Sequence, residues 1–386
     1  MTKIPNDTKT SLLVTAPIIE EYRKEIKHVM IAPFQKENAK GIGYNLSPSE
    51  LVYSLRKRRP LPIHYDDKGS YVWINAHDTI LTLSYEYVQV DGNISGLFLS
   101  KVRCVAKGLG NVSTTLDPSW QGMLLLSINN PTKRRMKLYV TDKRDGTEKR
   151  CTLITMVLWY TPETGCAESL TFHLDNPPMR ADVWNELIEP PHRIWKNNSY
   201  HRFQQLVHEI TNFKAKASPQ SSLAEKVRKG LLDLEIAAEG AFPHNRIMTA
   251  ILKLRDIIPD DGYDELREKF TELDMIATKD FNKEKLKNQI DLMRKECHYI
   301  ALCDEVEQIH EYIHDSIEKW WDNNKLAQVS SRWFFPYLPG IIASFILFVL
   351  LKTMFSAMEL NESLLGISAV IPLLVSIINN KFFKEK

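Results

Sequence analysis

The chain has 386 residues, which leaves room for two soluble domains besides a membrane segment. Its 50 Lys and Arg residues against 48 Asp and Glu residues give a net charge of +2, which argues neither for nor against a nucleic-acid partner. No overall basic bias demands a polyanion, and no nucleic-acid partner is expected. Five scattered cysteines without a CxxC pair exclude a disulfide framework and indicate a reduced, cytoplasmic chain. The N-terminal residues MTKIPNDTKT contain no apolar run, so no signal peptide is expected.

The first half of the chain has the pattern of a β-rich domain. Short runs of β-branched, aromatic and aliphatic residues lie at 71–74 (YVWI), 123–128 (MLLLSI) and 153–160 (LITMVLWY). Turn-forming residues separate such runs, as at 90–93 (VDGN) and 144–146 (RDG). Runs of this length between Gly, Asn and Asp clusters predict many short strands.

A series of motifs runs through the same region. In chain order they are IAPF at 31–34, GYNL at 43–46, ILTLSYEYVQV at 80–90, GLFLSKVRC at 96–104, AKGLG at 106–110, TTLDPSWQG at 114–122 and SINN at 127–130. Their order and spacing resemble the trimeric dUTPase / dCTP deaminase superfamily over roughly residues 10–170. Members of that family carry an Arg-Ser-Ser-like strand end, a Gly-Leu turn, an Asp-Pro-x-Trp-x-Gly hairpin and an Asn at the end of the next strand.

The resemblance implies a nucleotide site. Asp117 matches the carboxylate that meets the deoxyribose 3′-OH, and Ser100 matches the serine that contacts a phosphate. Lys101 follows that serine and can serve a phosphate as a point charge. The ligand-binding residues expected on this basis are Ser100, Lys101, Arg103, Asp117, Trp120, Gln121 and Asn130. An ordinary hairpin at 117–120 and surface residues on an edge strand are the alternative interpretation.

The catalytic groups of the family are missing from the matching positions. Leu99 stands where the family has an Arg that binds a phosphate with two hydrogen bonds, and Cys104 stands where a second Arg assists deamination, with Arg103 beside it. Ser127 stands at the position of the deaminase's Glu, and a serine unaided cannot act as the general base. No catalytic residue is therefore predicted. No cofactor is expected either, apart from Mg²⁺ with a bound nucleoside triphosphate.

Two short basic runs lie in the β-rich region, at 56–59 (RKRR) and 133–135 (KRR). Each could face the phosphates of a ligand. Each is also compatible with a solvated loop, which is the more common role of such runs.

Beyond a proline-containing linker at 176–199, the hydrophobic spacing becomes helical. Leu206, Ile210 and Phe213 are four and three residues apart, and the same spacing recurs after the polar link at 218–222, whose last serines are expected to cap the next helix. A break is predicted at 257–262 (IIPDDG), followed by one long helix over 281–326. These segments predict a helical stalk domain over residues 200–333.

The long predicted helix contains the sequence HEYIH at 310–314, a formal match to the zinc-binding motif HExxH. Cys303 and Glu307 share its face. Asp315 follows directly where zinc proteases carry an uncharged residue, and Glu318 is the nearest candidate for a third ligand. We therefore favour a polar helix face and predict no metal site, with a zinc peptidase as an alternative function.

The C-terminal segment contains two apolar runs, at 338–358 and 364–378, joined by the acidic linker ELNES at 359–363. A membrane span needs about 20 apolar residues. Aromatic residues precede the first run, and lysines follow the second. These features predict a two-span transmembrane hairpin within 334–386, with the lipid bilayer as a partner. The lysines and the even number of spans place both the N-terminal domains and the C-terminus on the cytoplasmic side of the cell's inner membrane. A buried helical pair of a soluble protein is the alternative.

Together these features predict an α+β multidomain chain. Its parts are a dUTPase/dCTP deaminase-like nucleotide-binding domain (1–175), a linker (176–199), a helical stalk domain (200–333) and a transmembrane helical hairpin (334–386). The hypothesis is a nucleotide-sensing membrane effector of bacterial antiphage defence, in which a nucleotide or cyclic nucleotide controls a membrane-disrupting hairpin. A homotrimer or larger homo-oligomer is expected. A membrane-tethered, active dCTP deaminase or dUTPase is the principal alternative.

Overall fold

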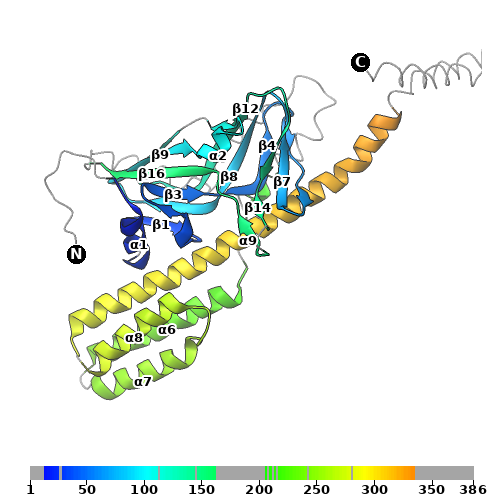
Figure 1. Cartoon of the computed structure of the whole chain (residues 1–386). Coiled ribbons are helices and arrows are strands. Elements are labelled where there is room, and N and C mark those ends of the chain that lie inside the picture. The colour runs from blue at the N-terminus through cyan, green and yellow to red at the C-terminus, as the bar shows by residue number, and fades with distance from the viewer. Residues whose placement is uncertain are drawn as a thin grey trace, which may run out of the picture. The chain divides into compact units, whose positions relative to one another are not determined.

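The protein is an α+β chain with a β-rich N-terminal region followed by long helices (Figure 1). The computed structural model describes residues 13–25, 28–111, 114–143, 146–161, 205–206, 208–210, 213, 216–240, 243–279 and 281–334. The chain divides into two units, Met1–Ile317 and Glu318–Lys386. The β-rich region and the helices up to Ile317 belong to the first unit.

Two large antiparallel sheets make up most of the β-rich region. In the first, neighbouring strands follow the order β10 (Gly110–Asn111), β12 (Gln121–Asn130), β8 (Asp78–Val90), β4 (Pro48–Ser54) and β5 (Arg59–Pro60), and β1 (Val29–Ala32) also pairs with β8. In the second, the order is β11 (Thr115–Leu116), β9 (Ile94–Ser100), β16 (Ile154–Tyr160), β3 (Gly43–Leu46) and β2 (Ala39–Lys40). The strands predicted at 80–90, 123–128 and 153–160 correspond to β8, β12 and β16, so these predictions are confirmed.

Smaller elements complete this region. They are the sheet β13 (Met136–Tyr139), β7 (Gly69–Ile74) and β6 (His64–Asp66), the pair β14 (Thr141–Asp142) and β15 (Lys149–Arg150), the helices α1 (Ala16–Glu25) and α2 (Val102–Val105), and the 3-10 turn η1 (Lys36–Asn38). A single apolar core joins the two large sheets, with Ile80 and Leu126 from one and Leu46 and Met156 from the other. Burying one such side chain stabilises the fold by roughly 1.5–3 kcal/mol relative to exposing it.

The described helices after the β-rich region are α6 (Pro219–Glu239), α7 (Pro243–Ile257), α8 (Asp264–Thr278) and α9 (Lys283–Phe334). Their apolar faces form a second core. Gly230 lets α6 approach α7 closely, because a Cβ atom there would lie 2.5 Å from a methyl carbon of Leu254. The predicted break at 257–262 separates α7 from α8, and α9 contains the long helix predicted from residue 281.

The predicted capping residue was wrong. Ser218, not the later serines, caps α6, and its side chain accepts a hydrogen bond from the Ser221 N–H.

The first part of α9 lies against the β-rich region within the same unit. The Tyr299 hydroxyl accepts a hydrogen bond from the backbone N–H of Phe34 at 2.8 Å, and the ring packs with Met30 and Ala32 of β1. Arg23 of α1 forms two hydrogen bonds with the Glu296 carboxylate, at 3.0 and 2.9 Å. These contacts join helices and strands that are more than 250 residues apart in the chain.

The predicted linker and the predicted membrane hairpin cannot be compared with these elements. Residues 176–199, and the two apolar runs between residues 338 and 378, lie outside the described residues. Within the part of the chain that the structure describes, no helix combines the length and the apolar character that crossing a membrane requires.

Candidate anion-binding site

The seven residues expected to bind a ligand lie in three places. Ser100 ends β9 opposite Ile154 of β16, and Lys101 and Arg103 follow at the start of α2. The second group is at the β11–β12 turn, which connects the two large sheets, and comprises Asp117, Trp120 and Gln121. Asn130 lies alone at the far end of β12.

One chain does not bring Asp117 and Ser100 together. Strand β11 pairs with β9 through Leu116 and Gly96, so Asp117 follows in register beside Ser95. Ser95 and Ser100 are five residues apart on the same strand, which corresponds to about 16 Å at the usual rise of a strand. The exposed Asp117 carboxylate and the Ser100 hydroxyl therefore cannot contact one small ligand in the same chain.

Trp120 and Asn130 have structural roles in the described contacts. The Trp120 ring is part of the core, and its Nε1 donates to the Gly122 carbonyl at 3.2 Å. Asn130 is fully buried, and its Nδ2 lies within hydrogen-bond distance of the backbone carbonyls of Ile74, Asn75 and Arg134. Its Oδ1 accepts from Thr132. Contact of either residue with a ligand stays a prediction, and the amide of Asn130 is already occupied by protein groups.

The first group borders a cavity of about 200 Å³ beside α2 and β13. Its lining residues are Lys68, Arg103, Cys104, Lys107, Leu109, Lys137, Leu138, Tyr139, Asp142, Cys151, Thr152 and Leu153. Four of these residues are Lys or Arg, whereas Asp142 is the one carboxylate among them. Lys101 is next to the cavity, because its Nζ donates to the hydroxyl of the lining residue Thr152 at 2.5 Å. The predicted residues Lys101 and Arg103 thus meet at a strongly basic cavity.

One of these cations pairs with a carboxylate, and the other three have no such partner among the described residues. Lys137 Nζ donates to Asp66 Oδ2 at 2.7 Å, and this hydrogen bond raises the pKa of Lys137 and lowers that of Asp66. No carboxylate among the described residues forms an ion pair with Lys68, Arg103 or Lys107. Burial, followed by the charges of Arg103 and Lys40, lowers the pKa of Lys101. A bound anion would relieve this repulsion between like charges.

The chemistry of the lining favours binding over conversion. Burial raises the pKa of the Cys104 thiol, so the thiol is protonated at neutral pH and is a poor nucleophile. Asp142 alone does not provide the oxygen ligands that Mg²⁺ requires, so the lining does not fit a protein-held magnesium ion, and phosphates would have to supply those ligands. Ser127, at the position of the family's base, lies within β12 opposite Leu81 of β8.

Sequence reasoning missed three of the cations. Lys107 belongs to the AKGLG motif, but the resemblance there rests on the Gly-Leu turn and does not mark the lysine. Lys68 lies in the β6–β7 turn, where its backbone N–H donates to Asp66, and Lys137 lies on β13. No sequence motif marks these two lysines. They come to the cavity only in the folded chain, where β13 pairs with β7 and β7 pairs with β6.

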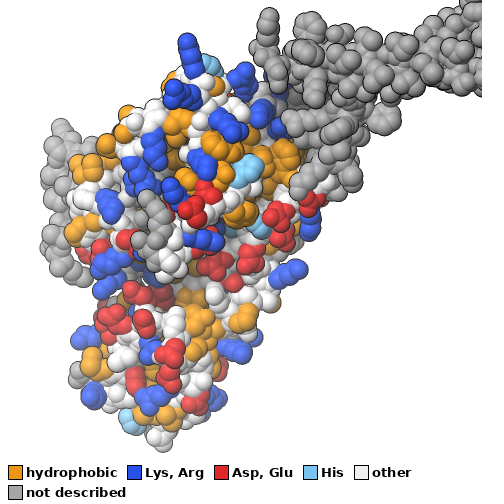
Figure 2. All heavy atoms as spheres, turned by 45° about the vertical axis from the view of Figure 1, so that its right-hand side comes forward, with side chains coloured by type: hydrophobic (Ala, Val, Ile, Leu, Met, Phe, Trp, Pro, Cys, Tyr) orange, Lys and Arg blue, Asp and Glu red, His pale blue; other side chains and the backbone are white. Residues whose placement is uncertain are grey.

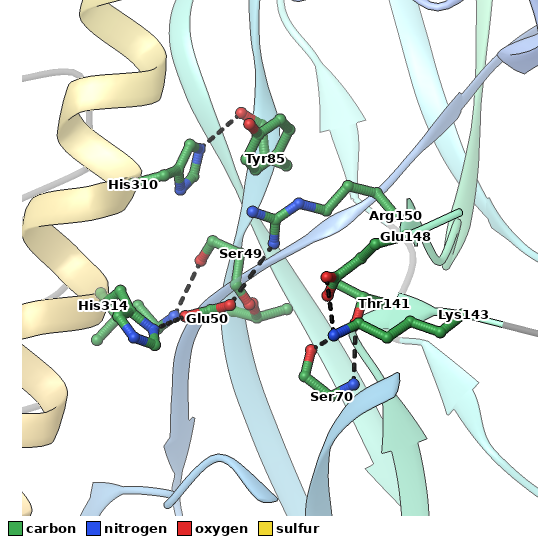
Figure 3. A network of polar contacts seen from close by, with 12 residues as sticks. Ser49, Glu50, Ser70, Tyr85, Thr141, Lys143, Glu148, Arg150, His310 and His314 are labelled. Carbon is green, nitrogen blue, oxygen red and sulfur yellow. Dashed lines mark hydrogen bonds and ion pairs between the residues drawn. The ribbon is translucent and has the colours of Figure 1, made fainter. Parts of the chain in front are cut away.

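The HEYIH motif has a different role from the zinc site considered above. Figure 3 shows His310 pointing toward Tyr85 and His314 toward Glu50. His310 Nε2 lies 2.8 Å from the Tyr85 carbonyl oxygen, and the two rings stack with their centroids 4.2 Å apart. His314 Nδ1 lies 2.5 Å from Glu50 Oε2. Burial lowers the pKa of His310 to about 3, so this imidazole is neutral and serves as a contact between α9 and β8.

Because the two imidazoles bind different strands, they do not converge on one metal ion. Among the described residues, no group of three or more His, Cys, Asp or Glu side chains is arranged to hold a metal ion. The zinc peptidase alternative therefore has no support in the described geometry. On the helix face that was predicted to be polar, His310 is buried, at 7 % exposed.

Solved structures resemble part of the chain, among them a deaminase and a dUTPase. No protein-family model and no curated protein matches the chain. The crystal structure of 2′-deoxycytidine 5′-triphosphate deaminase from Agrobacterium tumefaciens is 8 % identical over 39 % of this chain and 49 % of its own, with a TM-score of 0.30. The native dUTPase of EIAV is 16 % identical over 29 % of this chain and 91 % of its own, with a TM-score of 0.20. The chain thus covers about half the length of the deaminase.

Proposed function

We propose that the β-rich domain binds a nucleotide or cyclic nucleotide through its phosphates without converting it. The observation that carries this proposal is the cavity at α2, which Lys68, Arg103 and Lys107 line together and where none of the three forms an ion pair with a described carboxylate. Phosphate oxygens are the ligands that such a cluster of cations fits best. The motif resemblance supports the same site, since Ser100 and Lys101 stand at the positions that contact phosphate in the dUTPase / dCTP deaminase superfamily.

The wider proposal is a nucleotide-sensing membrane effector that acts in bacterial antiphage defence. In it, ligand binding changes the packing of the helical region and thereby controls a C-terminal membrane hairpin in the cell's inner membrane. The apolar runs at 338–358 and 364–378 support the hairpin. The length of α9 supports the coupling, because this helix contacts the β-rich region through Tyr299 and ends at Phe334, shortly before the first apolar run in the sequence. Such coupling requires only that the ligand binds two states with unequal affinity.

Calorimetry on the full-length protein in a neutral detergent tests the ligand site. The titrants are dCTP, dUTP and a cyclic dinucleotide, with chromatography of the same samples to detect conversion. Replacing Arg103 and Lys107 by Ala should weaken binding by at least about tenfold per cation, since a hydrogen bond to a charged group is worth roughly 1.5–3 kcal/mol. The matched control is Lys226→Ala with Lys253→Ala, at exposed positions on α6 and α7.

The outcomes separate the candidate functions. A sensor is supported if replacing Arg103 and Lys107 weakens binding, the control variant binds normally, and the nucleotide is recovered intact. Conversion of dCTP or dUTP would instead support the membrane-tethered enzyme. If no nucleotide binds, or if both double variants bind equally well, the cavity is not the nucleotide site.

A further inference from the structure

Three turns of the β-rich region lie side by side at one end of the first large sheet. They are the β4–β5 turn (55–58), the β7–β8 turn (75–77) and the β12–β13 loop (131–135). Arg56 Nη1 donates to the Ala76 carbonyl at 2.7 Å, which joins the first turn to the second. The backbone N–H of His77 donates to the Thr132 carbonyl at 3.3 Å, which joins the second turn to the third. The two basic runs, far apart in the sequence, therefore belong to one surface.

This surface concentrates positive charge. We call the exposed residues Arg56, Lys57, Arg58, Lys133, Arg134 and Arg135 the basic loop patch. None of the six forms an ion pair with a described carboxylate. The neighbouring Asp78 is buried, and its carboxylate accepts hydrogen bonds from the Ser54 hydroxyl and the Arg56 backbone N–H. Burial, followed by the charge of Arg59, lowers the pKa of Lys57, while the charge of Asp78 acts in the opposite direction.

The arrangement of charge over the molecule fits this picture. Figure 2 shows Lys and Arg side chains gathered over the upper, strand-rich part of the visible face, while Asp and Glu side chains gather lower down, toward the helices. The net charge of +2 is thus an average over oppositely charged regions. A near-neutral chain can still attract a polyanion to one face, because a local potential acts within about a Debye length of roughly 10 Å.

Aromatic side chains border the basic loop patch on its β13 side. The Arg135 guanidinium lies over the half-buried Trp73 ring, 4.2 Å from its centroid. Lys137 is the register partner of Trp73, lies 3.9 Å from the centroid of Tyr71, and also lines the cavity beside α2. A cationic surface with a stacked guanidinium on an aromatic ring therefore extends from the three turns to that cavity.

We propose that the basic loop patch binds the phosphate backbone of a single-stranded nucleic acid. Grooves for single strands combine cations that follow the phosphates with flat aromatic or guanidinium groups on which bases stack. The basic loop patch provides the cations, and Arg135 over Trp73 provides the flat group. A lipid surface fits less well, because the large exposed hydrophobic residues among the described ones, such as Val102 and Leu252, lie outside the three turns. This inference goes beyond the proposed nucleotide site and revises the expectation that the protein has no nucleic-acid partner.

Fluorescence anisotropy with the full-length protein in a neutral detergent tests the proposal. The probe is a labelled 20-nucleotide oligothymidylate, titrated over a range of salt concentrations. The test variant replaces Arg58, Lys133 and Arg135 by Ala. Each lost phosphate contact lowers the slope of log affinity against log salt by about 0.7, so three should weaken binding on the order of a hundredfold at about 0.1 M salt.

The control variant removes the same charge elsewhere, at the exposed Lys226, Lys253 and Lys287 of α6, α7 and α9. It should bind the oligonucleotide like the unaltered protein. A further variant, Arg135→Lys, keeps the charge but loses the flat group, so we expect weaker binding, by roughly fivefold or more, with a nearly unchanged salt slope.

Three results would overturn the inference. The first is no binding of the oligonucleotide at about 0.05 M salt, and the second is an equal loss of binding in the test and control variants. The third is that mixed micelles of the neutral detergent with phosphatidylserine bind through the same three residues while the oligonucleotide does not, since the partner is then an anionic lipid surface. Mononucleotide binding at the cavity is measured separately with Arg103 and Lys107, so failure of one site leaves the result for the other intact.

Discussion

Glu86 is a buried carboxyl group in the core of the β-rich region. Its side chain is 3 % exposed, and Oε2 accepts a hydrogen bond from the Ser47 backbone N–H at 2.9 Å. Hydrogen bonding to Ser47 does not replace the hydration of a carboxylate, and burial raises the pKa of Glu86 to about 7. The folded state therefore holds a proton on Glu86 in a pH range where the unfolded chain, with a pKa near 4.5, has lost it.

This difference predicts how stability depends on pH. Because the folded-state pKa is the higher one, the contribution of Glu86 to the free energy of unfolding falls as pH rises from about 4.5 to about 7. Across that range it falls by about 3 kcal/mol. Glu86→Gln keeps an acceptor for the Ser47 N–H without the charge. The free energy of unfolding of the variant should therefore gain relative to that of the unaltered protein as pH rises. Urea unfolding at pH 5 and pH 8, followed by tryptophan fluorescence, measures the gain.

The control for this prediction is Glu37→Gln, since Glu37 is exposed at η1. This substitution should shift the unfolding midpoint equally at both pH values. A constant difference between Glu86→Gln and the unaltered protein at pH 5 and pH 8 would show that Glu86 is ionised in the fold.

At the same scale, the sequence identified some site residues and misjudged others for a common reason. Lys101 and Arg103 were found because a motif marks them, and they do border the basic cavity. Trp120 and Asn130 belong to the same motifs. Trp120, however, packs in the core, and the Nδ2 atom of Asn130 lies within hydrogen-bond distance of three backbone carbonyls. A motif specifies the residue type and its place on a strand. Which groups the side chain of that residue contacts depends on loops that come close to it only when the chain has folded.

At the scale of elements, Glu296 joins three helices through buried charges. Its carboxylate accepts hydrogen bonds from Arg23 of α1 and from Lys269 Nζ of α8 at 2.8 Å, while its own helix is α9. Glu296 is 2 % exposed and Lys269 is 7 % exposed. Burial opposes ionisation, but the hydrogen bonds from Arg23 and Lys269 prevail and keep the pKa of Glu296 below its ordinary value.

Removing this carboxylate leaves Arg23 without a carboxylate partner and leaves Lys269 only the longer contact with Glu265, at 4.0 Å. We expect Glu296→Ala to lower the free energy of unfolding by about 3–5 kcal/mol, the usual effect of breaking a buried ion pair on one side. Urea unfolding at pH 7 measures it. Glu225→Ala is the matched control, because Glu225 pairs with Arg228 and Lys229 on the exposed face of α6, where such pairs contribute about 0–1 kcal/mol. If both variants lost the same free energy of unfolding, water would have to reach Glu296 in the folded protein.

Elements were more predictable than the contacts between them. Alternation and helical spacing are local properties, so β8, β12, β16 and the interruption between α7 and α8 follow from the sequence. The contact of α9 with the strands has no local signal. His310 illustrates this limit, because HEYIH has the spacing of a zinc motif while the ring of His310 stacks on Tyr85, 225 residues away.

At the scale of the whole molecule, the described surface suggests how a ligand site could be completed. Leu99, Val102 and Val105 are 42 %, 83 % and 54 % exposed, and they surround the start of α2 next to Arg103. Asp117 lies too far from Ser100 to share a ligand with it in one chain. We propose that a second copy covers α2 and presents its own Asp117 to the basic cavity, in the homo-oligomer expected from the sequence, which would explain both facts.

This arrangement predicts that one exposed residue controls both assembly and binding. Val102→Asp places a charge in the apolar contact, so the full-length protein should lose its oligomeric mass in light scattering and bind nucleotide at least about tenfold more weakly. Because Val102 is 83 % exposed, the fold itself should be unaffected. Ile236→Asp is the matched control, since Ile236 is 59 % exposed on α6. If Val102→Asp remains oligomeric while Ile236→Asp dissociates, copies of the chain associate through the helices, and the cavity beside α2 must bind its ligand with residues of one chain.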